Sequence, residues 1–330
     1  MNHLNHMFGT DPEAFIFKEY KIDKQLGKIP NIIPPIALVE DFGAKYTNRN
    51  GKKVLLYNEE FQWSEDGAAI ELQMNPTNDK IEFWNRLAIA KDELRKFLQK
   101  YELSMTMNTP IGFFSTKKYW EDRNEEFQSC VIFGCDPDMF PYHYVEIGLD
   151  KLGNNKTLDV SKHPYRYGGG HIHIQAPNKD PEIYMKNWEQ AAIIFDFFAG
   201  LSHVLNSTSQ IITLQEKFRL KYYGKPGRIR LQKYSTNPKI YGIEYRVLPN
   251  TWTTDNQKTY KLLSCLDISA DLIEKNKAKD FLYDFEKDIP KMHAAITTLN
   301  KRTAKILYER CIEWLLIQKL LSPNQLENLI

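Results

Sequence analysis

The hydrophobic pattern of the first quarter of the chain is typical of short strands. Between residues 8 and 76, runs rich in β-branched, aliphatic and aromatic residues alternate with clusters of turn-forming residues. The clearest runs are AFIF (14–17), KVLLY (53–57) and AAIELQM (68–74). We therefore expect strands joined by hairpins in this part of the chain.

A long amphipathic helix is predicted next. From a cap at Thr77 or Asn78, apolar residues recur at helical spacing to about Tyr101, with Glu and Lys on the opposite face. Further runs at 131–135, 171–176 and 240–248 have the composition of strands, and a helix is predicted at about 182–206. Beyond residue 255, apolar stripes with a period of 3.6 predict helices at 255–277 and 303–321.

This order of elements predicts the fold class. Strands come first, a long helix lies between them, helices come last, and no regular β–α–β alternation is present. The pattern indicates an α+β protein with an antiparallel sheet, flanking helices and a helical C-terminal tail. We place one large domain at residues 1–255 and a helical extension packed on it at 256–330. With 42% hydrophobic and 26% charged residues, the composition excludes disordered and fibrous classes.

The charge balance and the cysteine spacing indicate no membrane partner and no cysteine metal site, and nucleic acid is possible but not favoured. A formal charge of +2 creates no global field for nucleic acid or a membrane surface, so any basic site must be local. The cysteines lack metal-ligand spacing and are interpreted as reduced packing residues; they are Cys130, Cys135, Cys265 and Cys311. The N-terminus has no signal-peptide pattern, and the longest apolar run, at 191–205, is too short and too polar to span a bilayer. We expect a soluble, cytoplasmic protein.

Two segments near the N-terminus carry acidic side chains on predicted strands. Asp11 and Glu13 are two residues apart, so both carboxylates point to one face and can share a hard cation. Glu71 lies inside an apolar strand, where a carboxylate either faces solvent or binds a ligand. Asp66 precedes a glycine and is interpreted as a turn residue. Solvent-exposed acidic positions remain the alternative for each segment.

Two later strands repeat this arrangement. His171 and His173 share one strand face behind the glycine run 168–170, which allows the backbone to approach a ligand closely. Glu244 and Arg246 also share a face and could serve as a metal ligand and a fork for phosphate or carboxylate. An ion pair on an exposed sheet is the alternative for the second pair.

A basic segment adds a candidate anion site. Residues 217–233 contain no acidic residue and seven basic ones, which are Lys217, Arg219, Lys221, Lys225, Arg228, Arg230 and Lys233. This local charge suits a nucleotide polyphosphate or a nucleic-acid backbone, and a solvated loop is the alternative. Together with the acidic residues and histidines, it favours divalent cations that bridge phosphates. No Walker, Rossmann or nucleophile-elbow motif is present.

The order of motifs resembles a known family. GTDPEAF, DGAAIEL, RYGGGHIHI, GRIRLQKY and YGIEYRVLPNTW follow one another as in the phage-type carboxylate–amine ligases, a branch of the glutamine synthetase and glutamate–cysteine ligase superfamily. The resemblance covers roughly residues 8 to 255. It implies a curved antiparallel sheet that forms an open funnel, with ATP entering at one end and a carboxylate at the other. It also implies that ATP phosphorylates the carboxylate and that an amine then displaces phosphate to leave an amide.

The resemblance also implies roles for individual residues and cofactors. The metal ligands would be Asp11, Glu13, Glu71, His171 and Glu244. The contacts to ATP or to the substrate carboxylate would be His173, Lys225, Arg228, Arg230 and Arg246. Glu244, His173 and Arg246 would act directly in the reaction. The cofactors would be ATP and two or three Mg²⁺ ions, with Mn²⁺ as the alternative metal, and the protein would work in a cytoplasm, that of the host if a phage encodes it.

Two departures from the family pattern affect the metal site. The first-strand pair is Asp-Pro-Glu in place of Glu-x-Glu, and Ser64 stands where a second carboxylate is expected before Glu71. Glu65 or Asp66 must substitute, or the site is incomplete. The block FGCDPDMF, with Asp136 and Asp138, repeats the F-G-x-D-P pattern of the first strand and has no assigned role beyond substrate or amine binding.

Other functions fit the same residues. A metal-dependent phosphodiesterase or nucleic-acid-processing enzyme uses the same acidic and imidazole groups, and a catalytically inactive nucleotide-binding module would keep the fold. Consumption of ATP distinguishes the ligase from both. The identities of the acid and the amine, and the oligomeric state, are left open by the sequence.

Overall fold

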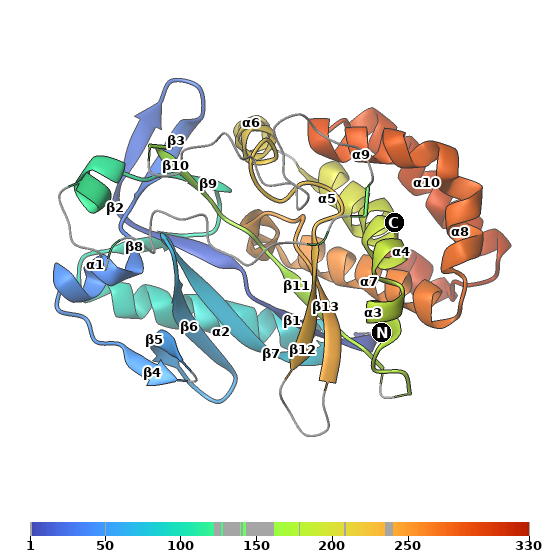
Figure 1. Cartoon of the computed structure of the whole chain (residues 1–330), viewed down its shortest axis with the longest axis horizontal. Helices are drawn as coiled ribbons and strands as arrows, with labels where there is room; N and C mark the ends of the chain where they lie inside the picture. Colours follow the sequence, from blue (N-terminus) through green and yellow to red (C-terminus); the bar gives the residue numbers. More distant parts are fainter. Residues whose placement is uncertain are drawn as a thin grey trace.

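A branched sheet with helices behind it and at one side forms the molecule (Figure 1). The computed structural model describes residues 2–49, 51–121, 162–177, 179–207, 209–234 and 240–329, together with Phe127, Met139, Pro141 and Tyr142. The predicted strand at 131–135, the acidic residues Asp136 and Asp138, and the cysteines Cys130 and Cys135 lie outside these residues.

The strands of the sheet pair in an order unlike their order in the chain. The main path is β10 (Tyr165–Tyr167), β9 (Ile111–Phe113), β3 (Gly27–Ile32), β2 (Glu13–Asp23), β7 (Ala69–Asp79), β1 (His3–Thr10), β11 (Ile172–Gln175), β13 (Ile240–Tyr245) and β12 (Ile229–Tyr234). The remaining strands are β4 (Thr47–Arg49), β5 (Lys52–Tyr57), β6 (Phe61–Asp66) and β8 (Ser104–Thr106). They pair β4 with β5, β5 with β6, β6 with β7 and β8 with β2. Among the described strands, only the pair β3–β9 is parallel.

The helices fall into two sets. The first set lies within the strand region and comprises α1 (Pro35–Glu40), α2 (Lys80–Gln99), η1 (Lys117–Glu121), α3 (Ile183–Lys186), α4 (Trp188–Phe195), η3 (Asp196–Gly200), α5 (Leu201–Asn206), α6 (Gln210–Arg219) and η4 (Asn250–Thr254). The second set follows the last strand and comprises α7 (Asn256–Glu274), α8 (Ala278–Phe285), η5 (Glu286–Asp288), α9 (Ile289–Thr298), α10 (Lys301–Ile317) and α11 (Pro323–Leu329). In Figure 1 the orange and red helices of the second set gather at the right of the sheet.

The expected α+β class, with its antiparallel sheet, flanking helices and C-terminal helices, is confirmed. The start of the long helix was predicted wrongly. Thr77 still pairs with Phe8 across β7 and β1, so α2 begins only at Lys80, where the Asp79 carboxylate caps the backbone N–H groups of Ile81 and Glu82. The helix predicted at 182–206 is a chain of shorter segments that includes a π turn, η3.

The core lies between the sheet and its helices. α2 packs on β7, and α7 packs on β1. In β7, Ile70 and Leu72 are fully buried in the largest hydrophobic cluster, and they alternate with Glu71 and Gln73. Since side chains alternate along a strand, the polar residues of β7 point away from the helices. This opposite face carries the site described below.

Two other expectations concern cysteines and membranes. Cys265 and Cys311 are free thiols buried in the core, as expected for packing residues. Within the described part of the chain, none of the helices combines the length and the apolar character that a membrane crossing requires.

Candidate active site

Strand pairing brings residues from distant parts of the sequence to the same face of the sheet. Glu71 of β7 lies directly opposite Glu13 of β2 on one side and Ser64 of β6 on the other. Further along the sheet, His173 of β11 lies opposite Glu244 of β13. Glu244 also lies opposite Arg230 of β12. The antiparallel register therefore creates two neighbouring groups of ionisable side chains.

The first group surrounds Asp11. Its carboxylate lies 3.0 Å from Nε2 of His173 and 3.4 Å from Nδ1 of His171. His171 Nδ1 also lies 3.2 Å from Oε1 of Glu244, which is completely buried. Within the described residues, ligand atoms of Asp11, His173 and Glu244 all lie within 4.8 Å of one another. These three side chains can hold a metal ion together.

The charges in this first group stabilise one another. Burial alone would raise the pKa of Asp11, but the neighbouring charges and hydrogen bonds of His173 and His171 bring it well below its usual range. Burial would likewise lower the pKa of His173, but Asp11 raises it to about 9. For Glu244, burial and Asp11 act to raise the pKa, and Arg246 and the two histidines bring it below its ordinary value. Asp11 and Glu244 are therefore ionised at neutral pH, as metal ligands must be.

The second group contains carboxylates that repel one another. Glu13 accepts hydrogen bonds from the backbone N–H of Gly169 at 3.0 Å and from the Tyr223 hydroxyl at 3.3 Å. Glu71 lies 3.3 Å from Nζ of Lys52 and accepts a hydrogen bond from Gln73 at 2.9 Å. All the same, both carboxylates are buried, and a neighbouring negative charge destabilises each of them.

This repulsion is visible in the ionisation of the second group. Burial, followed by the charge of Asp66, raises the pKa of Glu13 to about 8. Burial and the charges of Asp11 and Asp66 raise the pKa of Glu71 to about 8. Burial also raises the pKa of Asp66 itself. A divalent cation among these oxygens would remove the repulsion, so the donor set fits a hard ion such as Mg²⁺.

The structure distinguishes between the two candidates for the missing carboxylate near Ser64. In β6, Ser64 lies opposite Glu71, and Asp66 is two residues further along the same strand face. The charge of Asp66 acts on both Glu13 and Glu71. Glu65 alternates to the other face and lies 3.9 Å from Lys53. Asp66 therefore belongs to the acidic group, and it also closes the turn at 67–68 by pairing with Ala69, as the sequence predicted.

The glycine run before the histidines is required by close packing. A Cβ on Gly169 would lie 2.4 Å from Nε2 of His171. A Cβ on Gly170 would lie 2.4 Å from the backbone oxygen of Pro249. This space allows the backbone N–H of Gly169 to reach the carboxylate of Glu13. Gly169 thus binds a site carboxylate through its backbone N–H.

The basic residues of the segment 217–233 separate into different places. Arg230 lies 3.6 Å from Glu244, and the fully buried Arg246 donates to the same carboxylate. Arg228 is also buried, and its backbone carbonyl accepts a hydrogen bond from the N–H of Arg246. Lys225, by contrast, lines a separate hollow with Lys217 and Lys221.

Arg219 makes its contacts inside the protein core rather than at the cavity wall. It is fully buried, its guanidinium donates to both carboxylate oxygens of Glu216, and it also donates to the backbone carbonyl of Val247.

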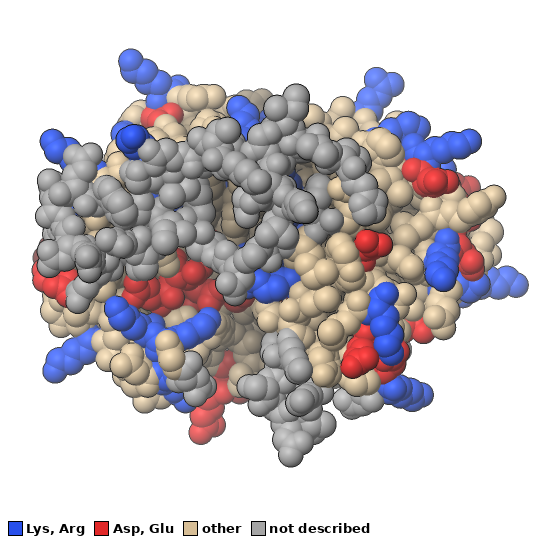
Figure 2. Space-filling model, viewed as in Figure 1, with Lys and Arg blue, Asp and Glu red and all other residues tan. Residues whose placement is uncertain are grey.

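A cavity of about 530 Å³ opens over both groups of ionisable side chains. Asp11, Glu71, His173 and Arg230 line it, so a ligand in this cavity meets acidic, imidazole and guanidinium groups at once. Its other lining residues are Met7, Gly9, Thr10, Lys52, Gln73, Met74, Pro76, Gln175 and Gln232. Figure 2 shows a band of acidic side chains on the viewed face, with basic side chains beside it.

Sequence reasoning missed three polar residues of the site. Lys52 contacts Glu71, and Gln232 donates to Glu244. The Tyr223 hydroxyl lies 2.9 Å from His171 Nε2 and also contacts Glu13. Gln232 could have been found from its alternation with Arg230 on one strand. Nothing in the local sequence distinguishes Lys52 from the neighbouring Lys53, or Tyr223 from Tyr222.

Comparison with known proteins gives little further information. No protein-family model matches the chain, and no curated protein is similar to it in sequence. Among solved structures, the chain is similar to one described as the crystal structure of a novel glutamine synthase homolog. That similarity has a TM-score of 0.39 at 11% sequence identity, over 94% of this chain and 67% of the other. The functional assignment therefore rests on the site itself.

Proposed function

We propose that this protein is an ATP- and Mg²⁺-dependent ligase that phosphorylates a carboxylate and joins it to an amine. The observation that carries the proposal is the meeting of two acidic groups, one built on Asp11, His173 and Glu244 and one on Glu13 and Glu71, at a single cavity. Such an array suits divalent cations that hold a polyphosphate. The motif order that resembles carboxylate–amine ligases supports this reaction over other phosphoryl transfers.

Different residues of the chain would bind the cations and position Arg246. Asp11, His173 and Glu244 would hold one cation, and Glu13 and Glu71 a second, with Asp66 beside them; the bound cations would neutralise charge on the phosphate oxygens. Glu244 and His171 contact the Arg246 guanidinium and so hold it in a fixed position.

The guanidinium groups would act on the phosphate. Arg246 would stabilise the charge that develops on the transferred phosphoryl group, and Arg230 at the cavity wall would bind a phosphate or the substrate carboxylate. Binding in the cavity would limit the access of water to the acyl phosphate until the amine arrives.

The proposal is tested with hydroxylamine in place of the unknown amine. The protein is incubated with ATP, Mg²⁺, hydroxylamine and a pool of extracted carboxylates, and ADP release and hydroxamate formation are measured. We expect both products to appear together, and the mass of the hydroxamate identifies the acid. Glu244→Gln should reduce both signals by at least about 100-fold, because Glu244 would hold a cation and Arg246, and loss of one charge-stabilising group costs about this much. Glu309→Gln, at an exposed helical position, is the matched control.

Other outcomes would assign a different function. Hydrolysis of a phosphodiester without ATP, lost in Glu244→Gln, would replace the ligase with a metal-dependent phosphodiesterase. Binding of ATP without turnover, across small-molecule, peptide and protein carboxylates, would indicate an inactive nucleotide-binding module. Absence of ATP binding in the presence of Mg²⁺ would contradict the proposal.

A further inference from the structure

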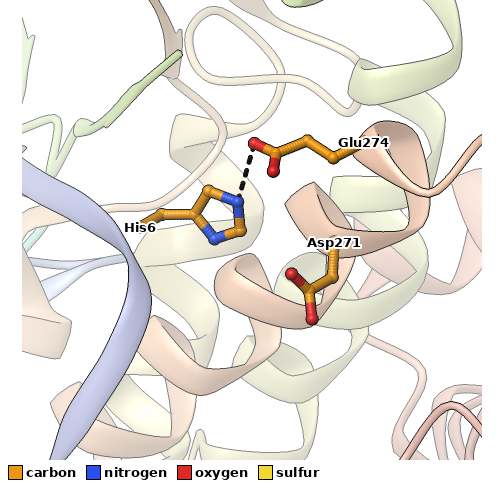
Figure 3. Close-up of side chains that lie close together, drawn as sticks. All are labelled: His6, Asp271 and Glu274. Atoms are coloured by element: carbon orange, nitrogen blue, oxygen red, sulfur yellow. Dashed lines mark hydrogen bonds and ion pairs between the residues drawn. The ribbon is translucent and has the colours of Figure 1, made fainter. Parts of the chain in front are cut away.

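A second group of metal-ligating side chains lies where β1 meets α7, away from the cavity. Among the described residues, ligand atoms of His6, Asp271 and Glu274 lie within 4.8 Å of one another. Figure 3 shows the three side chains converging, with His6 on the strand and the two carboxylates on the helix. Asp267, Asp271 and Glu274 are spaced four and three residues apart, so they share the face of α7 that meets β1.

Asp267 holds the imidazole of His6 in a fixed orientation. Its Oδ1 atom lies 2.7 Å from His6 Nδ1 and also accepts the backbone N–H groups of Asn5 at 2.9 Å and His6 at 3.0 Å. A carboxylate that accepts the Nδ1–H of a histidine directs the other ring nitrogen toward a metal. Here Nε2 lies 2.8 Å from Oε1 of Glu274, so the nitrogen already faces a second potential ligand.

The local charge and access also suit a cation. The side chains of His6, Asp271 and Glu274 are 4%, 11% and 24% exposed, so the imidazole is withdrawn from water and Glu274 is partly accessible. Three carboxylates lie near one imidazole here, and an ion bound to Asp271 would replace the Lys275 ammonium that lies 2.8 Å from its Oδ2 atom. A hollow of about 290 Å³, lined by Asp267, Asp271 and Lys275, reaches the group at Asp271.

We propose that His6 Nε2, Asp271 and Glu274 bind a divalent transition-metal ion of the zinc class. One imidazole and two carboxylates form a common ligand set for such an ion, and a water molecule would complete a four-coordinate site. The ion would replace the proton between His6 and Glu274 and would tie α7 to β1. Because β1 leads directly to Asp11, the ion would stabilise the strand that carries the candidate active site.

The test uses Co²⁺ as a spectroscopic probe in the full chain. Glu13→Gln, Glu71→Gln, His171→Gln, His173→Gln and Glu244→Gln are combined to remove ligands from both proposed cation positions of the candidate active site, so that Co²⁺ binding there does not interfere. We expect one equivalent of Co²⁺ by equilibrium dialysis, tetrahedral absorption in the visible range, and a higher unfolding temperature. Adding His6→Gln should abolish all three. Adding His3→Gln, on the same strand with a side chain that is 74% exposed, should preserve them.

A variant with an intermediate expected effect distinguishes a metal site from an ion pair. Asp267→Asn should weaken Co²⁺ binding by about 10-fold, because loss of the orienting carboxylate has effects of this size. No bound equivalent of Co²⁺ in the disabled chain, or an unchanged equivalent in His6→Gln, would overturn the proposal and leave the group as an ion-pair contact between β1 and α7.

A measurement without further substitution covers the case in which His6→Gln fails to fold. The Co²⁺ adduct of the disabled chain should show an exchangeable, paramagnetically shifted proton from the Nδ1–H of a ligating histidine. The absence of such a proton would also overturn the proposal.

Discussion

At the scale of single residues, neighbouring charges decide which buried carboxylates are ionised. Asp11 lies between two imidazoles, and its pKa is well below the usual range, with burial opposing and the histidines lowering it. Glu71 is equally buried, but its closest charged neighbours include Asp11 and Asp66, and its pKa is raised to about 8. An ionised carboxylate is therefore stabilised in one group and destabilised in the other, which is typical of a functional site.

Replacing Glu71 should reveal this destabilisation. We expect Glu71→Gln to raise the unfolding free energy by on the order of 1 kcal/mol in EDTA, because the amide keeps the shape and removes a repelled charge. The same variant should lose the stabilisation that Mg²⁺ gives the parent chain. Thermal unfolding with and without Mg²⁺ measures both effects, and Glu19→Gln, at an exposed position of β2, is the control. If Glu71→Gln lowered the unfolding free energy in EDTA, the proposed repulsion between Glu71 and its acidic neighbours would be contradicted.

At the scale of elements, close contacts between backbone segments hold the site together. The glycine run before β11 passes against η4, where Trp252 donates a hydrogen bond to the backbone oxygen of Gly170. Asn250 of the same segment donates to the backbone oxygen of Glu13. One irregular segment thus positions two strands that carry ionisable groups.

A methyl group at Gly170 should disturb this contact. Its Cβ would lie 2.4 Å from the backbone oxygen of Pro249 and 2.4 Å from Nε1 of Trp252, and a backbone atom cannot rotate away. We expect Gly170→Ala to lower the unfolding free energy by on the order of 3 kcal/mol in urea titrations. Gly9→Ala is the matched control, because its nearest contact would be 3.4 Å and its effect should be clearly smaller. Equal effects of the two variants would contradict this account.

At the scale of the whole molecule, the sheet and the C-terminal helices share one core. The largest hydrophobic cluster includes Phe8 of β1 and Ile172 of β11 together with Leu263 of α7 and Phe281 of α8. Any change in ionisation on the polar face of the sheet therefore affects the unfolding of this common core.

The stability of the cation-free protein should depend on pH with a predictable sign. Glu13 and Glu71 have pKa values raised to about 8, so between their ordinary values and pH 8 the folded chain binds more protons than the unfolded chain. Burial also raises the pKa of Asp196 to about 7, and Asp11 raises that of His173 to about 9 against the effect of burial. Both groups therefore also make the folded chain less stable as pH rises. Stability from these groups is present at low pH and is lost as pH rises.

The expected result is a fall in unfolding temperature on the order of 5 °C from about pH 6 to about pH 8 in EDTA. Saturating Mg²⁺ should reduce the fall, because the cation binds the deprotonated carboxylates. The double variant Glu13→Gln, Glu71→Gln should show a smaller fall in EDTA than the parent chain. Scanning calorimetry at several pH values measures these differences, and a flat or rising profile in EDTA would refute the assigned ionisation.

The sequence by itself determined the local features. The two-residue spacing put Arg246 close enough to donate to Glu244. Asp11 lies between β1 and β2, so strand alternation does not extend to Asp11 and Glu13, and these two carboxylates belong to different groups. Helical stripes predicted α7 and α10. The helix start moved to Lys80 because pairing of Thr77 across the sheet overrode the local cap signal.

Only the tertiary structure decided which distant residues meet. The register of the sheet put Glu13 against Glu71 and Glu244 against His173, and it put Asp66 rather than Glu65 on the site face. It also placed His6 of β1 against α7, more than 260 residues later in the chain. Register depends on the packing of all strands and helices around one core, and no local window of sequence contains that information.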